Sequence, residues 1–431
     1  MTPAARVAAA IEIFADIETR HRPAADALKD WGLSHRFAGS KDRAALASLV
    51  YDALRCRASA AWIMGKETPR AIMLGSLRQM GGFGADAIAA LFTGEGFAPP
   101  PLSEEERARL ETRTLDGAPV WVRGDFPEWL TASLAAVFGE AAADEGRALA
   151  IRAPLDLRVN TLKATREKAA AALNHLNAAP TSLSPIGLRL PFLEDGRGHS
   201  LAGEPAYVKG LVEIQDEGSQ LAALLSGARP GEQVLDLCAG GGGKTLALAA
   251  MMENRGQIYA TDREARRLGG IHPRLEKAAT RNIQVRTPRR GADVLADLEG
   301  RCDLVLIDAP CTGTGTWRRN PDAKWRMRPG ALEQRMKEQE EILETAQRFL
   351  NVDGRILYVT CSLLREENED RIAAFLQHHA DFTAIGPAGL ARAGGLPELA
   401  GFASRLGPAL RLSPLASGTD GFFIAGLKRG T

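Results

Sequence analysis

The hydrophobic positions in the first hundred residues follow the spacing of packed helices. Five apolar residues between positions 41 and 64 recur at helical spacing, namely Leu46, Leu49, Val50, Ala53 and Leu54. An earlier apolar stripe runs from Val7 to Ile17. No strand-like alternation occurs before about residue 115. The pattern therefore predicts a separate helical bundle at the start of the chain.

From about residue 207 the pattern changes to short apolar strands that alternate with helices. The predicted strands are Gln233–Cys238, Gln257–Thr261, Ile283–Arg286, Leu304–Ile307 and Ile356–Val359. Short apolar strands separated by helices are typical of parallel βαβ units in a doubly wound sheet. The tail, Thr419–Leu427, is predicted to add a hairpin at the edge of this sheet.

A segment between these two parts mixes both patterns. A strand candidate, Leu155–Asn160, is followed by a helix candidate, Thr165–Leu176. This combination predicts a small α+β module. We therefore expect an α/β protein with three domains, at residues 1–115, 116–206 and 207–431.

The composition is that of an ordinary globular protein, with 45% hydrophobic and 25% charged residues. Because 54 basic residues balance 53 acidic ones, any basic binding surface must be local. The chain has no apolar stretch of membrane-spanning length and no signal-peptide core. Its five cysteines form no CxxC pair, which argues against a disulfide framework and a zinc site. We expect a cytoplasmic monomer with no metal and no membrane partner.

A run of four glycines, Gly240–Gly243, joins the first strand of the predicted sheet to a helix that begins near Lys244. Glycines at such a turn let a ligand approach the backbone closely. A phosphate-binding P-loop needs a glycine at position 238, where this chain has Cys238. A nucleoside ligand fits better, because Asp262 ends the second strand, where an acidic residue commonly holds ribose hydroxyls. The alternative is a tight turn with Asp262 as a helix cap.

Two cysteines follow the carboxyl ends of two predicted strands. Cys311 comes after Asp308-Ala-Pro, and Cys361 comes directly after Thr360. A doubly wound sheet has its active site at this edge, and a reactive thiolate there suits covalent catalysis. Cys238 also ends a strand, but its position before the glycines favours a packing role.

The segments around Asp236, Asp308 and Cys361 resemble motifs I, IV and VI of the RNA (cytosine-5) methyltransferases, which use S-adenosylmethionine (SAM). The whole chain is similar to their Sun-type, RsmB-like bacterial branch. This resemblance implies three domains in order: an all-α NusB-like RNA-binding domain, a small α+β RNA-binding module, and a Rossmann-like class I SAM-dependent methyltransferase domain. The glycine loop departs from the family, whose motif usually reads Cys-Ala-Ala-Pro-Gly-Gly-Lys-Thr. Gly240-Gly241 replaces the Ala-Pro pair, which predicts a more flexible loop and weaker SAM binding.

The resemblance also implies a role for each site residue. Cys361 is the nucleophile that adds to carbon 6 of cytosine and so activates carbon 5 for methylation. Cys311 assists product release, and Asp308 hydrogen-bonds the cytosine. The residues expected to bind SAM are Cys238, Ala239, Gly240, Gly241, Gly242, Gly243, Lys244, Asp262, Asp293 and Asp308. Lys244 is equally consistent with a solvated helix start, and Asp293 with an ordinary loop carboxylate.

A basic segment follows Cys311. We expect it to bind RNA phosphates and to stack a base, through Arg318, Arg319, Lys324 and Trp325. The alternative is a solvated surface. A second basic cluster is expected to face solvent and consists of Arg263, Arg266, Arg267 and Arg274.

The leading hypothesis is therefore an enzyme that methylates carbon 5 of a cytosine in RNA, with 16S (small-subunit) ribosomal RNA as the expected substrate. Transfer RNA or another RNA is an alternative. In DNA cytosine-5 methyltransferases the nucleophile is the cysteine of the Pro-Cys motif, which here would be Cys311 and would leave Cys361 without a role. Another class is a non-catalytic RNA-binding or ribosome-assembly factor. A GTPase or ATPase is disfavoured by Cys238.

Overall fold

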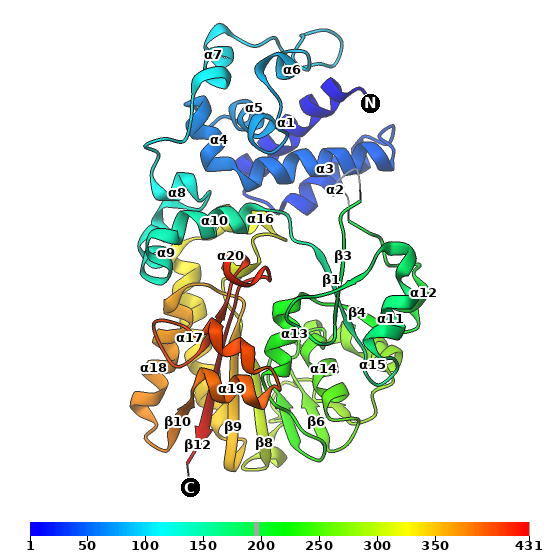
Figure 1. The fold of residues 1–431 in the computed structure, drawn as a ribbon, viewed down its shortest axis with the longest axis vertical. Coiled ribbons are helices and arrows are strands. Elements are labelled where there is room, and N and C mark those ends of the chain that lie inside the picture. Colours follow the sequence, from blue (N-terminus) through cyan, green and yellow to red (C-terminus); the bar gives the residue numbers. More distant parts are fainter. Residues whose placement is uncertain (194–197, 431) are drawn as a thin grey trace. The chain divides into compact units, whose positions relative to one another are not determined.

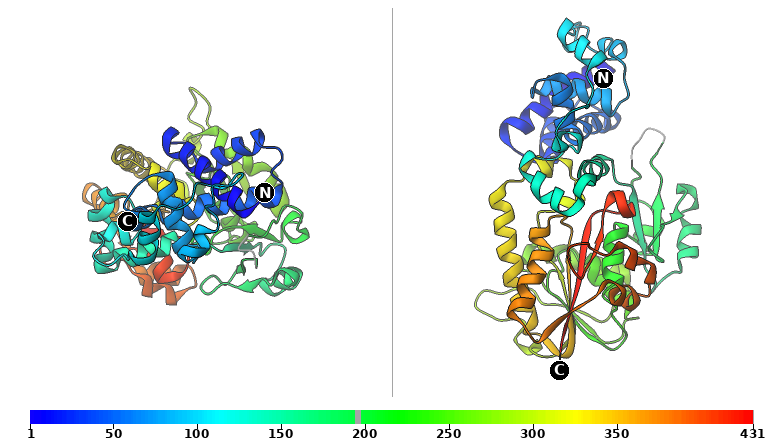
Figure 2. Two further views of the ribbon diagram at one scale, coloured as in Figure 1. Left: turned by 90° about the horizontal axis from the view of Figure 1, so that it is seen from above. Right: turned by 60° about the vertical axis from the view of Figure 1, so that its left-hand side comes forward.

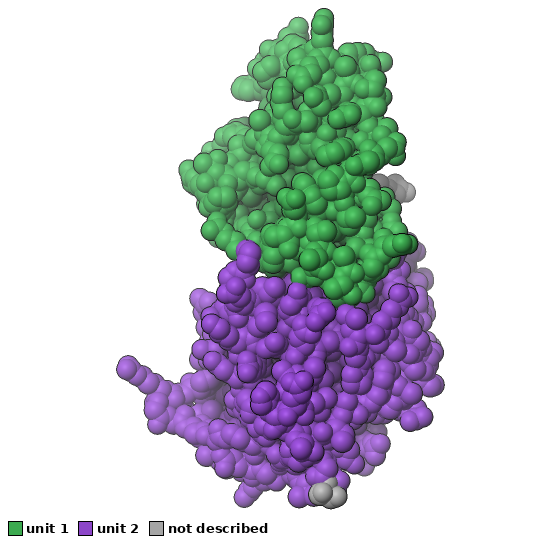
Figure 3. Space-filling model, turned by 90° about the vertical axis from the view of Figure 1, so that its left-hand side faces the viewer, with its two compact units in different colours: residues 1–152, 317–328 green, residues 153–316, 329–431 purple. Residues whose placement is uncertain are grey.

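Residues 1–193 and 198–430 are described by the computed structural model of the chain, and they divide into two units (Figure 3). Unit 1 contains Met1–Arg152 and Trp317–Arg328, and unit 2 contains Ala153–Thr316 and Pro329–Thr431. The three domains expected from the sequence remain predictions. Residues 194–197, in the expected middle module, lie outside the described residues.

Unit 1 is entirely helical in its described residues. Its helices are α1 (Pro3–Arg20), α2 (Ala24–Ser34), α3 (Ser40–Arg55), α4 (Arg57–Met64), α5 (Pro69–Gln79), α6 (Ala85–Ala89), α7 (Glu104–Thr112), α8 (Val120–Arg123), α9 (Thr131–Phe138), α10 (Ala142–Ala150) and α16 (Pro321–Arg326). The predicted stripe is buried, since Leu46, Val50 and Leu54 of α3 are at most 1% exposed. The helical bundle expected from the periodicity is thereby confirmed.

The segment that carries α16 belongs to unit 1 although its sequence interrupts unit 2. The Lys324 ammonium donates hydrogen bonds to the backbone oxygens of Arg55 and Asp125, at 2.8 and 2.6 Å. The indole N–H of Trp325 donates to the backbone oxygen of Leu54 at 2.6 Å. The last carbonyls of a helix lack partners within the helix, so these two side chains satisfy the C-terminal end of α3.

These contacts contradict the RNA-binding role expected for Lys324. Its side chain is 1% exposed, and burial lowers the pKa of its ammonium group to about 8. A buried ammonium that donates to backbone carbonyls has no surface with which to bind a phosphate. Trp325 is partly buried against the core of unit 1, and its N–H is engaged there. The RNA contacts expected of Arg318 and Arg319 remain predictions.

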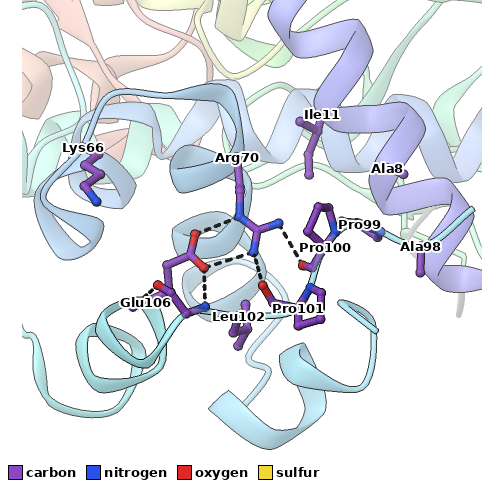
Figure 4. Close-up of a pocket in the computed structure, with 11 residues that line it drawn as sticks. Ala8, Ile11, Lys66, Arg70, Ala98, Pro99, Pro100, Pro101, Leu102 and Glu106 are labelled. Carbon is purple, nitrogen blue, oxygen red and sulfur yellow. Dashed lines mark hydrogen bonds and ion pairs between the residues drawn. The ribbon is translucent and has the colours of Figure 1, made fainter. Parts of the chain in front are cut away.

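Unit 1 also has a groove of about 660 Å³ beside α1, lined in part by Ala98–Pro101 (Figure 4). Arg70 lines this groove, and all three of its guanidinium nitrogens donate hydrogen bonds. The guanidinium bonds Glu106 at 2.8 Å and the carbonyls of Pro100 and Pro101 at 3.0 Å. These bonds fix the proline segment against α5.

Unit 2 contains two sheets. The smaller is antiparallel in the order β2-β3-β1-β4 and consists of β1 (Leu155–Val159), β2 (Ala179–Pro180), β3 (Gly187–Leu190) and β4 (Val212–Ile214). The larger has the order β10-β12-β9-β8-β5-β6-β7, with β11 paired to β12. Its strands are β5 (Gln233–Asp236), β6 (Gln257–Ala260), β7 (Ile283–Val285), β8 (Cys302–Asp308), β9 (Leu350–Thr360), β10 (Phe382–Ile385), β11 (Leu410–Leu412) and β12 (Phe422–Arg429).

All five strands predicted for the larger sheet are present and parallel, which confirms the doubly wound α/β fold. The prediction that the tail, Thr419–Leu427, lies at the edge of this sheet is wrong. Strand β12 lies between β9 and β10 and not at the edge. The reason is that Phe423, Ile424 and Leu427 are all fully buried, so both faces of this strand are covered.

Helices cover both faces of the larger sheet (Figures 1 and 2). The helices of unit 2 are α11 (Arg166–Ala172), α12 (Pro205–Val208), α13 (Glu217–Leu224), α14 (Gly243–Met251), α15 (Ile271–Ala278), α17 (Pro329–Gln347), α18 (Glu369–His378), α19 (Pro387–Ala393) and α20 (Pro414–Ser417). Leu304 and Leu306 of β8 pack with α13, α14 and α19, whereas Val305 and Ile307 pack with α17 and α18. Alternate residues of one strand thus bury opposite faces of the sheet.

The segment after Asp262 is not one continuous α-helix. Ala265–Gly270 forms a 3₁₀ helix, and α15 begins at Ile271 with Pro273 in its first turn. A proline there is tolerated because the first N–H groups of a helix have no partner within it. None of the described helices is long and apolar enough to cross a membrane.

Candidate active site

The carboxyl ends of β8 and β9 bring together the two cysteines expected to be catalytic. The two strands are parallel neighbours, Asp308 pairs with Val359, and each cysteine follows its strand directly or within three residues. The Sγ atoms of Cys311 and Cys361 lie 3.4 Å apart. The fold therefore brings two cysteines that are 50 residues apart in the sequence into direct contact.

The contact between the two thiols changes the acidity of Cys311. The hydrogen bond with Cys361 raises the pKa of the Cys311 thiol well above its ordinary value, and burial adds to this shift. A thiol with a raised pKa is a poor nucleophile but holds its proton firmly.

A buried carboxylate, Glu367, holds the loop that carries Cys311. The backbone N–H of Thr312 donates to Glu367 Oε1 at 2.9 Å, and the Thr312 hydroxyl donates to Oε2. Gln339 of α17 donates to Oε1 as well, at 3.0 Å. Burial raises the pKa of Glu367, which is fully buried. The sequence pattern alone gave Glu367 no role.

Asn368 holds the residues on both sides of Cys361. The Thr360 hydroxyl donates to the Asn368 side-chain oxygen at 2.6 Å, and the Asn368 amide donates to the Ser362 carbonyl at 2.8 Å. Asn368 is fully buried. Two successive residues, Glu367 and Asn368, thus fix the neighbours of both thiols.

Lys244 and Asp308 form an ion pair next to the cysteines. The ammonium lies 2.7 Å from Asp308 Oδ2 and 5.3 Å from the ring centre of Phe422. Lys244 is only 7% exposed, so the alternative of a solvated lysine at the helix start is wrong. Asp308, at the end of β8, keeps one carboxylate oxygen outside this pair.

The residues after β5 and the end of β6 border a cavity of about 690 Å³ in unit 2, whereas Ala239–Lys244 are not among its lining residues. Cys238, Asp262 and Asp293 all line it, so three residues expected to bind SAM share one wall. Asp262 Oδ2 accepts the N–H of Gly240 at 3.0 Å, and Oδ1 accepts the N–H of Glu264 at 3.0 Å. Asp262 therefore caps the following turn and faces the cavity at the same time.

In the basic cluster expected to face solvent, Arg263, Arg266 and Arg267 are exposed and Arg274 is half-buried. Arg267 lines the cavity and lies 3.3 Å from Asp262 Oδ2, and Arg263 also lines the cavity. Arg266 is 92% exposed, as expected. A further part of the cavity wall comes from the segment after β8 and from α17, and it includes Pro310, Arg335, Glu338 and Ile342. Sequence reasoning missed this wall because α17 lies 70 residues beyond Asp262 and carries no recognisable motif.

Two buried groups in β5 and the turn after it complete the site. Burial raises the pKa of the Cys238 thiol well above its ordinary value, in keeping with a packing role. Burial also raises the pKa of Asp236 to about 7, although the Thr245 hydroxyl donates to Asp236 Oδ2 at 2.6 Å. Asp236 Oδ1 has no hydrogen-bond partner within the described ranges 1–193 and 198–430.

The arrangement combines a cofactor-sized cavity, two adjacent thiols and a lysine–aspartate pair at the carboxyl edge of a doubly wound sheet. A Cβ added at Gly240 would stand 3.8 Å from Asp262 and 3.6 Å from Arg267, both of which line the cavity. The backbone at Gly240 therefore lies within van der Waals reach of two residues that line the cavity. Such a site is able to hold a nucleoside cofactor beside a base attacked by a thiolate.

Comparison with known proteins agrees with this geometry. A family described as 16S rRNA methyltransferase RsmB/F matches residues 223–428, and the ferredoxin-like domain of RsmF/B-like methyltransferases matches residues 126–192. A probable ribosomal RNA small subunit methyltransferase B from Synechocystis is 32% identical over 315 residues, which cover 70% of this chain and 67% of that protein.

Two solved structures share the fold. The crystal structure of the protein PH0851 aligns over 100% of this chain and 99% of its own, with 25% identity and a TM-score of 0.72. NSun6 from Pyrococcus horikoshii, solved with the SAM analogue SFG, aligns over 71% of this chain and 99% of its own, with 22% identity and a TM-score of 0.59.

Proposed function

Because the chain belongs to the RsmB/F family of methyltransferases, which use SAM, we propose that it methylates carbon 5 of a cytosine in 16S ribosomal RNA. The observation that carries this proposal is the pair of thiols 3.4 Å apart beside the Lys244–Asp308 pair. The choice of ribosomal RNA rests on the name of the Synechocystis relative, two thirds of whose length the match covers.

The cofactor cavity fits a nucleoside with a charged tail. Asp262, at the end of β6, presents its carboxylate to ribose hydroxyls, and Asp293 faces the same cavity from the segment after β7. The loop from Cys238 to Lys244 lies along the rest of the bound molecule. SAM supplies the methyl group when it is bound there.

Cys361 acts on carbon 6 of the cytosine. Its thiolate forms a bond to carbon 6, and the electron pair of the carbon 5–carbon 6 double bond moves so that carbon 5 becomes nucleophilic. Asp308 hydrogen-bonds the edge of the base and stabilises charge that develops on the ring. Lys244, at 2.7 Å, holds the Asp308 carboxylate in place for this contact.

Cys311 serves the release step. After methylation, carbon 5 must lose its proton, the double bond must form again, and the electrons of the carbon 6–sulfur bond must return to Cys361. Cys311 assists this loss of the proton, as a base or through a relay to one. The choice of Cys361, and not Cys311, as the attacking nucleophile rests on the resemblance to the RNA (cytosine-5) methyltransferases.

The decisive experiment uses the full chain with the substitution Cys311→Ala, SAM and unmethylated 16S ribosomal RNA. If release fails, a covalent protein–RNA adduct persists on a denaturing gel, and adding Cys361→Ala abolishes it. A wild-type protein that makes 5-methylcytosine while Cys311→Ala gives no adduct contradicts the role of Cys311. If neither protein reacts with the RNA, the proposed substrate is wrong.

A further inference from the structure

The middle of the glycine loop accepts a hydrogen bond from an arginine on a neighbouring helix, Arg274. Its beginning is fixed by the end of β6, since the Ala239 N–H donates to the Thr261 carbonyl at 2.8 Å and the Gly240 N–H donates to Asp262. The carbonyl of Gly241, which lies between Gly240 and the start of α14, accepts a hydrogen bond from Arg274 Nη1 at 2.5 Å. Arg274 belongs to α15.

Arg274 is fixed at its other nitrogen. Its Nη2 lies 3.1 Å from Glu213 Oε2, and Glu213 is only 3% exposed. Lys277, one turn further along α15, pairs with the other Glu213 oxygen at 2.6 Å. A buried carboxylate in β4 thus holds the guanidinium in the orientation that reaches Gly241.

Position 241 is where the family usually has proline. Glycine there frees the backbone dihedral that proline would fix, so the loop needs another restraint to keep one shape. A Cβ at Gly241 would stand 3.2 Å from Arg274 Nη1. The guanidinium therefore lies against the space that any side chain at this position would enter.

We infer that Arg274 is a positioning residue for SAM, and that it restrains the glycine loop in place of the missing proline. A charged donor aimed at a carbonyl fixes the peptide plane between Gly241 and Gly242, just before α14 begins. The N–H groups that follow then keep the directions needed to hold the cofactor. The inference depends on SAM as cofactor and not on the base or RNA that is methylated.

The test compares Arg274→Ala with Lys277→Ala in the full chain. Both substitutions remove one ion pair from Glu213, and only the first removes the contact with the loop. We expect the dissociation constant for SAM, measured by calorimetry without RNA, to rise about tenfold in Arg274→Ala and less than about twofold in Lys277→Ala. In methylation assays with RNA, Arg274→Ala should raise KM for SAM and leave kcat at saturating SAM nearly unchanged.

Arg274→Gln provides a second variant, because its amide keeps one donor without the charge and should give an intermediate affinity. Thermal melting without SAM separates a folding defect from a loop defect. The inference is wrong if Arg274→Ala binds SAM as the wild type does, or if Lys277→Ala weakens SAM binding equally. Because calorimetry needs no RNA, failure of the proposed substrate would leave this result intact.

Discussion

The Glu367 carboxylate accepts both the backbone N–H and the hydroxyl of Thr312, the residue that follows Cys311. The carboxylate is fully buried and is shared with Gln339. The position of Cys311 relative to Cys361 therefore depends on an acidic residue that touches neither thiol.

Replacing Glu367 by glutamine should disturb this position. The amide N–H₂ of the new glutamine would replace a carboxylate oxygen that now accepts a hydrogen bond from Thr312 or Gln339. We expect the loss of this acceptor to lower the free energy of unfolding by about 2 kcal/mol. We expect a lower kcat and slower release of the RNA adduct. Glu217→Gln is the matched control, since Glu217 is also fully buried and accepts two backbone N–H groups, from Leu183 and Ser184. An equal loss of activity in both variants would contradict a specific role for Glu367.

Oxidation should join the two thiols. At a separation of 3.4 Å, a hydroperoxide that oxidises one thiol to a sulfenic acid lets the other displace water and form a disulfide. Mass spectrometry should show one Cys311–Cys361 crosslink and the loss of two hydrogens, with activity restored by dithiothreitol. Cys302, which is buried away from other thiols, should stay reduced. Survival of both free thiols under mild peroxide would show that they lie farther apart in solution.

The stability of the fold should respond to the protonation of Asp236. Its pKa is raised from 3.8 to about 7 in the folded chain. Between these pH values the unfolded chain has released a proton that the folded chain still holds, so stability falls as pH rises through this range. We expect Asp236→Asn to remove part of this decline, as measured by urea unfolding at pH 5 and pH 8. An unchanged difference between the two pH values would show that Asp236 ionises normally.

Removing the Lys324 side chain should destabilise unit 1. Lys324→Met keeps the length of the side chain but leaves the carbonyls of Arg55 and Asp125 without their donor, at a cost of about 2–3 kcal/mol. Lys337→Met, on α17, is the comparison for loss of a lysine elsewhere. Denaturant unfolding measures the effect. An equally stable Lys324→Met chain would mean that water replaces the ammonium.

Sequence periodicity predicted the parallel strands because each is a short apolar run buried on both faces, as Leu304 and Val305 illustrate. It predicted the meeting of Cys311 and Cys361 because parallel strands end at one edge of a sheet. It failed for Lys324, because a basic stretch has the same composition whether it is solvated or buried on the carbonyls of a distant helix. It also gave no role to Arg274, whose partners Gly241 and Glu213 are 33 and 61 residues away.

The course of the chain through residues 317–328 limits how this protein can evolve. These residues lie within the sequence of unit 2, yet their contacts lie within unit 1. A recombination at residue 152 that supplied a different first unit would leave Lys324 and Trp325 without the carbonyls of α3. A chimaera with a different unit 1 therefore keeps these contacts only if residues 317–328 are exchanged together with unit 1.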